Sequence, residues 1–150
     1  MVSETVSSVL RRKGRQVLSI APDASVYDAI ALMAENSIGA LLVLSDGLPV
    51  GILSERDYAR KVVLQNRSSK DTHVSEIMST PVLTVGPSHT IEECMRLMTD
   101  KRIRHLPVME GPSIAGIVSI GDLVRSVITV QSETIQYLQQ YINGTAVPQA

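Results

Sequence analysis

An internal repeat is the sequence feature that most constrains how this chain can fold. The phrase GILSERD at residues 51–57 returns as GIVSIGD at residues 116–122, 65 residues further along the chain. At that offset, residues 17–58 align with residues 82–123 without a gap. Self-similarity at a fixed spacing indicates a structural unit that has been duplicated. We therefore expect two copies of one small domain.

The repeat extends upstream of these aligned blocks. VSSVL at residues 6–10 is similar to VSEIM at residues 74–78, at an offset of 68, so the first copy carries an insertion of three residues around Lys13 and Gly14. The segment NRSSKDTH between the copies is polar and rich in turn formers, which is typical of a linker. The predicted boundaries are 6–65 for the first repeat, 66–73 for the linker, 74–130 for the second repeat and 131–143 for a C-terminal helical extension.

Each copy has the pattern of a strand, a helix, two strands and a second helix. The apolar runs VLSIAP (17–22) and VLTVGP (82–87) end at a proline, as short strands do. Ser25 and Thr90 then stand three residues before an acidic residue, the spacing of a capping box at the start of a helix. The predicted fold is α/β (α+β): two pseudo-symmetric β-α-β-β-α repeats packed through their sheets, plus a C-terminal helix.

Composition and charge exclude several classes of protein. The 150 residues carry a formal net charge of −1, which is not the electrostatic pattern of a dedicated nucleic-acid or membrane-surface binder. No apolar stretch has the length of a membrane span, so we expect a soluble, cytoplasmic protein. The single cysteine, Cys94, stands on the apolar stripe of a helix and is interpreted as a core residue; the three histidines show no metal-binding spacing.

The stretch from Asp122 to Ile142 contains no Gly or Pro and is followed by Asn-Gly, a helix C-cap signal, which predicts a long final helix. Its apolar residues exceed the number that one small domain needs. Either the helix packs against a second subunit or it folds back on the protein's own core, and both interpretations fit the pattern. We expect a homodimer. These apolar residues are Val124, Val127, Ile128, Ile135, Leu138 and Ile142.

The repeated phrase has a structural and a chemical interpretation. Ser54-x-x-Asp57 and Ser119-x-x-Asp122 each fit a helix-capping box, in which case nothing binds there. Alternatively, a helix N-terminus that follows a strand favours a phosphate, and an aspartate in the first turn can accept hydrogen bonds from two ribose hydroxyls. The glycine three residues before each serine favours the second interpretation, because it allows close approach of another group to the strand.

Cations near the two phrases support a phosphorylated ligand. Arg56 lies beside Asp57, and Lys13 belongs to the RRKG insertion at residues 11–14. Both favour a nucleotide phosphate over the sulfonium of S-adenosylmethionine. For Arg11 and Arg12, a solvated helix face is the preferred interpretation.

With these motifs on residues 6–130, the chain resembles a stand-alone, bacterial-type tandem pair of cystathionine-β-synthase (CBS) domains. The resemblance rests on the two G-h-x-S-x-x-D phrases, VSEIMSTPVLTVGP, RHLPV and the gapless repeat. It implies that an adenosine-containing nucleotide binds between the two halves, with each Asp holding a ribose and each Ser contacting ribose or phosphate. It therefore nominates Ser54, Asp57, Ser119 and Asp122. The implied base pocket consists of Ser19, Ile20, Thr84, Val85, Gly39, Ala40, Leu41, Arg104, His105, Leu106 and Pro107.

The two clefts should be inequivalent. The 65-residue offset pairs Gly39 and Ala40 with Arg104 and His105, so one copy supplies room and the other supplies charge and an imidazole ring. For His105, a surface histidine without a ligand fits equally well.

These expectations converge on a non-catalytic sensor. We find no nucleophile, base or metal set with a recognisable spacing, so the chain is not expected to be an enzyme. It should bind AMP by preference, or ADP, ATP or NAD(H), and signal by a change of conformation or oligomer, or through an unidentified target protein. The alternatives are a structural or partner-docking protein with empty clefts, and a weak nucleic-acid binder.

Overall fold

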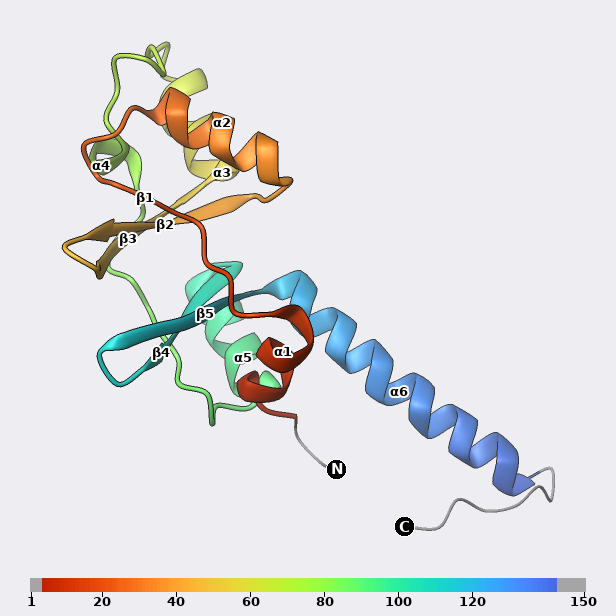
Figure 1. Cartoon of the computed structure of the whole chain (residues 1–150). Coiled ribbons are helices and arrows are strands. Elements are labelled where there is room, and N and C mark those ends of the chain that lie inside the picture. Colours follow the sequence, from red (N-terminus) through yellow and green to blue (C-terminus); the bar gives the residue numbers. More distant parts are fainter. Residues whose placement is uncertain (1–3, 143–150) are drawn as a thin grey trace. The chain divides into compact units, whose positions relative to one another are not determined.

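The structure, a computed structural model, describes residues 4–142. The chain forms two compact units (Figure 1). Unit 2 consists of Gln16–Thr84, and unit 1 combines the N-terminal segment up to Arg15 with the chain from Val85 onward. The predicted α/β fold is confirmed. Packing of the repeats through their sheets stays a prediction.

Unit 2 is built on a three-stranded sheet in the order β1-β2-β3. β1 lies parallel to β2, and β2 and β3 form the predicted antiparallel hairpin. The second helix of the repeat begins as α3 and continues as the π-helical turn η1. The elements are β1 (Ser19–Ile20), α2 (Val26–Asn36), β2 (Ala40–Ser45), β3 (Leu48–Ser54), α3 (Glu55–Tyr58), η1 (Ala59–Val63) and α4 (Val74–Ile77).

Helix α2 forms where the sequence predicts it. The Ser25 hydroxyl accepts a hydrogen bond from the Asp28 N–H (3.1 Å), which satisfies one of the free donors at the helix start. Val26, Ala29 and Met33 follow at helical spacing and are buried in the apolar core of unit 2. The predicted linker also packs on this end of the helix, because Thr72 is buried and its carbonyl accepts from the Val26 N–H (2.9 Å).

Unit 1 contains one two-stranded hairpin with helices from both ends of the chain. The capping box predicted at Thr90 and Glu93 is present at the start of α5. The long final helix is also confirmed through residue 142, whereas its predicted Asn-Gly cap lies outside the described residues. The elements are α1 (Val6–Lys13), α5 (Ile91–Lys101), β4 (His105–Glu110), β5 (Ser113–Ser119) and α6 (Ile120–Ile142).

The strand predicted over 82–87 is wrong. Only an isolated parallel bridge forms there, between Val85 and Val108. In unit 2, the Leu42 N–H of β2 donates to the Leu18 carbonyl next to β1 (3.4 Å). The equivalent residue of β4 is Pro107, which has no N–H to donate, so this part of the parallel ladder cannot be repeated.

The compact units do not coincide with the sequence repeats, because the first helix of each repeat packs in the other unit. Helix α1 lies against β5, and a Cβ on Gly116 would stand 2.7 Å from the Leu10 side chain. Helix α4 lies against β3, and a Cβ on Gly51 would stand 2.5 Å from the Met78 sulfur. The close approach to the strand that these glycines were predicted to allow is made by helix side chains, so helix packing explains the glycines without a ligand.

Candidate functional site

Each unit brings one part of the predicted site together at the open end of its hairpin. In unit 2, Ala40 at the start of β2 pairs with Ser54 at the end of β3, and the Glu55 N–H donates to the Gly39 carbonyl (3.0 Å). We call Gly39, Ala40, Ser54 and Asp57 the unit 2 half-site.

Unit 1 repeats this construction. His105 at the start of β4 pairs with Ser119 at the end of β5, and the Ile120 N–H donates to the Arg104 carbonyl (2.9 Å). We call Arg104, His105, Ser119 and Asp122 the unit 1 half-site. The sequence offset therefore identified residues that occupy equivalent positions in the two units.

Asp57 is buried at the start of α3 and closes a capping box. Its Oδ2 accepts from the Ser54 N–H (3.0 Å), and its own N–H donates to the Ser54 hydroxyl (3.1 Å). The other carboxylate oxygen, Oδ1, accepts from the Ser79 hydroxyl (2.9 Å) and pairs with Lys61 Nζ (3.1 Å). The capping interpretation of the phrase is correct for this copy. Capping alone does not decide whether the carboxylate also accepts bonds from a ligand.

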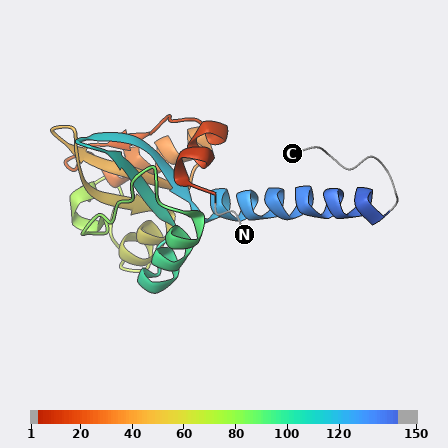
Figure 2. The ribbon, with the colours of Figure 1, turned by 90° about the horizontal axis from the view of Figure 1, so that it is seen from below.

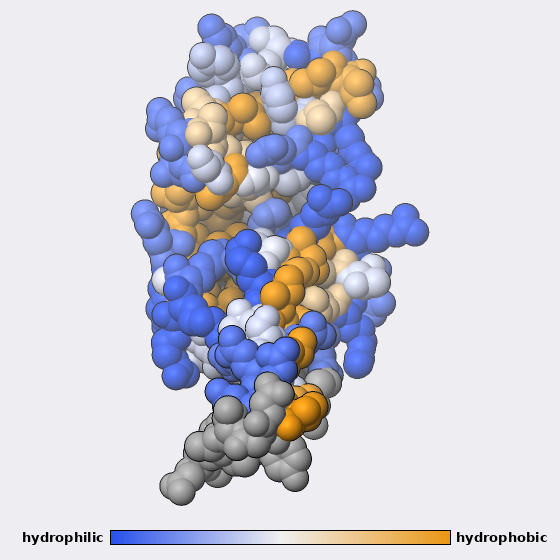
Figure 3. All heavy atoms as spheres, turned by 90° about the vertical axis from the view of Figure 1, so that its right-hand side faces the viewer, coloured by the Kyte–Doolittle hydropathy of each residue, from blue (hydrophilic) through white to orange (hydrophobic). Residues whose placement is uncertain are grey.

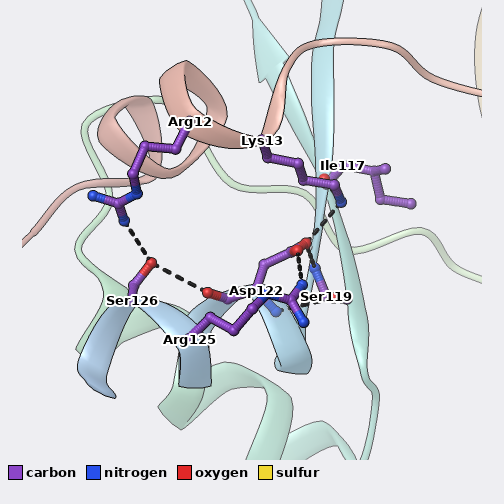
Figure 4. A network of polar contacts seen from close by, with 7 residues as sticks. All are labelled: Arg12, Lys13, Ile117, Ser119, Asp122, Arg125 and Ser126. Carbon is purple, nitrogen blue, oxygen red and sulfur yellow. Dashed lines mark hydrogen bonds and ion pairs between the residues drawn. The ribbon is translucent and has the colours of Figure 1, made fainter. Parts of the chain in front are cut away.

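Asp122 closes the equivalent box at the start of α6 but has two cationic partners (Figure 4). Its Oδ2 accepts from the Ser119 N–H (2.8 Å) and from Lys13 Nζ (2.7 Å), and its Oδ1 accepts from Arg125 (2.6 Å). Burial raises the pKa of this carboxyl, but the hydrogen bonds from Lys13 and the Ser119 backbone outweigh that effect and lower the pKa below its ordinary value. Asp122 is therefore ionised at neutral pH.

Lys13 explains why the two half-sites differ. Its amine also donates to the Ile117 carbonyl (2.7 Å), and the equivalent Ile52 carbonyl in unit 2 accepts from the Ser79 backbone N–H (2.8 Å). The insertion in the first repeat thus places a charged amine in unit 1 where unit 2 uses a neutral serine. This difference was not among the reasons for which the sequence predicted inequivalent clefts.

His105 is partly buried in unit 1 and is not a freely exposed side chain. Burial lowers its pKa, and the positive charges of Lys13 and Arg104 act in the same direction, whereas the charge of Asp122 opposes them. The imidazole is therefore neutral at pH 7 and offers one donor and one acceptor.

The implied base-pocket residues contribute in different ways. Leu41 and Leu106 are completely buried, so only their backbone groups are available to a ligand. Ser19 and Ile20 lie in β1, parallel to the middle of β2. Thr84 immediately precedes Val85, whose N–H donates to the Pro107 carbonyl (3.1 Å).

The basic residues near the half-sites differ in their contacts. Arg56 is exposed on α3 and makes no side-chain hydrogen bond or ion pair within residues 4–142. Arg12 forms an ion pair with Glu4 and donates to the Ser126 hydroxyl (2.7 Å), which in turn donates to the Asp122 carbonyl (3.1 Å). Arg12 is exposed, as the interpretation of a solvated face predicts, but it also makes these contacts where α1 packs against α6.

Sequence reasoning missed three partners of the two carboxylates. Lys61 stands four residues after Asp57 and Arg125 three residues after Asp122, a helical spacing that predicts such pairs. Ser79 has no comparable signal, because it reaches Asp57 only through the folding of α4 against β3.

The described part of the chain offers neither a metal cluster nor a membrane-spanning helix. Within residues 4–142, no three His, Cys, Asp or Glu side chains are grouped closely enough to hold a metal ion. None of the helices described is both long and apolar enough to span a bilayer.

Sequence comparison identifies the class of protein that this fold and these paired half-sites define. The family model for the CBS domain matches the chain twice, over residues 6–64 and 74–129. The chain therefore belongs to the CBS-domain family, as the repeated motifs indicated.

Known proteins resemble the chain over most of its length. A mitochondrial CBS domain-containing protein of Arabidopsis thaliana, CBSX3, is 42% identical over 95% of this chain and 73% of its own length. The solved structure of a putative signal-transduction protein with CBS domains from Burkholderia ambifaria is 54% identical, with a TM-score of 0.81 over 83% of this chain and 94% of that one. A hexameric CBS-CP12 protein from bloom-forming cyanobacteria is 30% identical, with a TM-score of 0.77 over 87% of this chain and 75% of that one.

Proposed function

We propose that this protein is a non-catalytic sensor that binds an adenosine nucleotide at each half-site. CBS-domain proteins are generally regulatory modules that bind adenosine ligands. The observation that carries the proposal for this chain is the recurrence of one arrangement in both units. In each, a hairpin end meets a helix start that bears a buried carboxylate with a cationic partner.

The chemistry of the half-sites supports a ribose. The Asp57 carboxylate has four described partners and the Asp122 carboxylate has three, whereas an ionised carboxylate has about four lone-pair positions in total. A ribose diol supplies two adjacent hydroxyl donors, which such a carboxylate can accept. A ligand of this kind would displace exposed partners, such as Lys61 at Asp57 and Arg125 at Asp122.

The cations support a phosphate on that ligand. Arg56 has no described partner, so its guanidinium is available to a phosphate, and the Lys13 amine already lies beside Asp122. AMP is therefore the favoured ligand, with ADP, ATP or NAD(H) as related candidates. That each nucleotide lies in a cleft between the two repeats stays a prediction, as does the transmission of binding through conformation, oligomer or target protein.

The different partners of the two carboxylates support unequal affinities. Asp122 faces two cations, whereas Asp57 faces one cation and a serine hydroxyl. One charged hydrogen bond is worth about 1.5–3 kcal/mol, so a difference of one such bond changes affinity roughly tenfold or more.

Calorimetric titration with AMP, and separately with NAD(H) and adenosine, tests the proposal. We expect AMP to bind with two classes of site, and adenosine to bind more weakly because it lacks the phosphate. Mass spectrometry of small molecules released from the purified protein should identify an adenosine nucleotide. Absence of binding to every adenosine ligand would contradict the proposal and leave a structural or partner-docking role.

The predicted homodimer is also part of this proposal. The cyanobacterial CBS-CP12 protein forms hexamers, which supports self-association as a property open to related chains. The surplus apolar face of the final helix is the proposed interface of the homodimer.

A further inference from the structure

The exposed part of α6 carries an apolar stripe with a regular spacing. Beyond Val127, every described side chain of the helix is exposed. Apolar side chains that are 41% to 78% exposed follow one another along one face, and Gln131 fills the one polar position among them (Figure 3). The α6 stripe consists of Val124, Ile128, Gln131, Ile135, Leu138 and Ile142.

The spacing of the α6 stripe is that of a coiled coil. Its members are separated alternately by four and three residues, which keeps them on one face of helices that wind around each other. The isoleucines at 128, 135 and 142 occupy the a positions, and Leu138 occupies a d position. Ile at a with Leu at d favours a parallel, two-stranded coiled coil.

The stripe faces away from the core of its own unit. In the first turns of α6, the buried side chains are Asp122, Leu123 and Ser126, which occupy the b, c and f positions outside the stripe. Figure 2 shows α6 continuing past α1 and α5, the helices against which its first turns pack. The interpretation that α6 folds back over its own core is therefore wrong for the described residues.

An uncovered helix of this kind would be marginal in water. Isolated helices need roughly 12–15 residues even in Ala-rich sequences. The described side chains from Ile128 to Ile142 are all exposed, so burial does little to compensate for the poor helix formers among them. The β-branched and aromatic residues of this segment have weaker helix propensity than alanine. A packing partner for the stripe would supply the missing stabilisation.

Charge identifies a second copy of the chain as a suitable partner. Between Ser126 and Ile142, the only charged residue is Glu133, at an f position that points away from the stripe. The flanking e and g positions from Val127 to Gln139 are uncharged, and the one charged flanking residue before them, Arg125 at an e position, is paired with Asp122 of its own helix. Two identical helices therefore meet with little like-charge repulsion. Beyond Arg125, the seam offers no charged group that a partner of opposite charge could bind.

We propose that α6 pairs along the α6 stripe with α6 of a second copy, as a parallel, two-stranded coiled coil. This proposal rests on the homodimer proposed above and names its interface. Gln131 determines the orientation. In a parallel, in-register pair the two Gln131 amides meet in one layer and hydrogen-bond to each other, whereas an antiparallel pair buries each amide against an apolar side chain.

A matched pair of lysine variants tests the interface. Ile135→Lys places a charge in the α6 stripe, and Gln136→Lys places the same charge on the neighbouring exposed position outside it. Light scattering of the full chain should give a dimer for the parent and for Gln136→Lys, and a dissociation constant at least a hundredfold higher for Ile135→Lys. Circular dichroism should show that both variants keep their sheet and helix signals.

The outcomes separate the two proposals. A dimer that survives Ile135→Lys unchanged would overturn the α6 interface and leave the homodimer in place. A parent chain that is monomeric at all concentrations would overturn both, and would leave another protein as the occupant of the stripe. Titration of the same variants with a nucleotide measures affinity at the half-sites separately from dimerisation, because no residue of the α6 stripe belongs to the half-sites.

Cysteine cross-linking tests the parallel orientation. Leu138→Cys should form a disulfide between copies under mild oxidation, whereas Tyr137→Cys, on the adjacent exposed position, should not. The native Cys94 is buried and does not compete. If Leu138→Cys fails to cross-link in a protein that is dimeric, the parallel in-register arrangement is wrong.

Discussion

Replacing Lys13 by Met tests whether the inserted amine supports the unit 1 half-site. The change removes two hydrogen bonds of 2.7 Å, one to the Asp122 carboxylate and one to the Ile117 carbonyl. A charged hydrogen bond contributes about 1.5–3 kcal/mol, and because the Lys13 side chain is 34% exposed, solvent screening places the loss near the lower end, about 1.5–2 kcal/mol. For a chain of this size, that corresponds to a fall in melting temperature of about 3–8 °C.

The loss should depend on pH, because it acts through an ionised carboxylate. The folded-state pKa of Asp122 is lowered, so the stability that it contributes is complete above its unfolded-state pKa of about 3.9 and disappears as the pH falls through the lower folded value. The difference between the parent and Lys13→Met should therefore be largest near neutral pH and should shrink below pH 4.

Urea unfolding between pH 3 and pH 7 measures this difference in the free energy of unfolding. Arg11→Met is the matched control, because Arg11 is exposed on the same helix and has no described partner. The control should differ from the parent by at most about 0.5 kcal/mol at every pH. An equal loss in both variants, or a loss for Lys13→Met that does not change with pH, would refute the reasoning.

Two further predictions concern packing. Gly116→Ala should destabilise the protein by about 1–3 kcal/mol in thermal unfolding, because the new Cβ would stand 2.7 Å from the Leu10 side chain. Gly39→Ala is the control and should have a small effect, because its Cβ would meet Glu55 at 3.5 Å. Equal effects of the two substitutions would contradict the close packing of α1 on β5. Burial raises the pKa of the Cys94 thiol to about 11, so a thiol reagent at pH 8 should modify Cys94 only after unfolding. Rapid modification of the native protein would contradict the place of Cys94 in the core.

Much of the local structure could be predicted from the sequence, because it depends on short-range patterns. The capping boxes at Thr90 and at both repeated phrases follow from a three-residue spacing that operates within one helix turn. The hairpins and the long final helix follow from the apolar periodicity and the absence of helix breakers. The gapless repeat then showed which residues occupy equivalent places in the two units.

The features that could not be predicted depend on long-range packing. The repeat gave no sign that α1 and α4 pack in exchanged units, although the glycines that accommodate Leu10 and Met78 were visible in the repeated phrase. The missing strand follows from one residue, Pro107, whose lack of an N–H matters only once its partner strand is known.

The same limit applied to the candidate site. Asp57, Asp122 and their serines were identified correctly as a recurring pair at equivalent positions, because one phrase contains each pair. Lys13 was predicted as a phosphate-side cation from the RRKG insertion, but its bond to Asp122, and that of Ser79 to Asp57, join distant segments and could not be predicted. Whether any of these residues contacts a ligand stays a prediction.

Calorimetric titration of capping-acid variants with AMP tests the central claim most directly. Asp57→Asn and Asp122→Asn keep the size of the side chain and an oxygen that can accept the capping bond, but remove the charge that would hold a ribose. Glu93→Gln makes the same change in the capping box of α5, which belongs to neither half-site, and is the control for capping alone. We expect each Asp variant to lose about tenfold or more in affinity at one class of site and Glu93→Gln to bind like the parent. If both Asp variants bind AMP with the parent's affinity, the two carboxylates serve only as helix caps and the proposed ribose contacts are wrong.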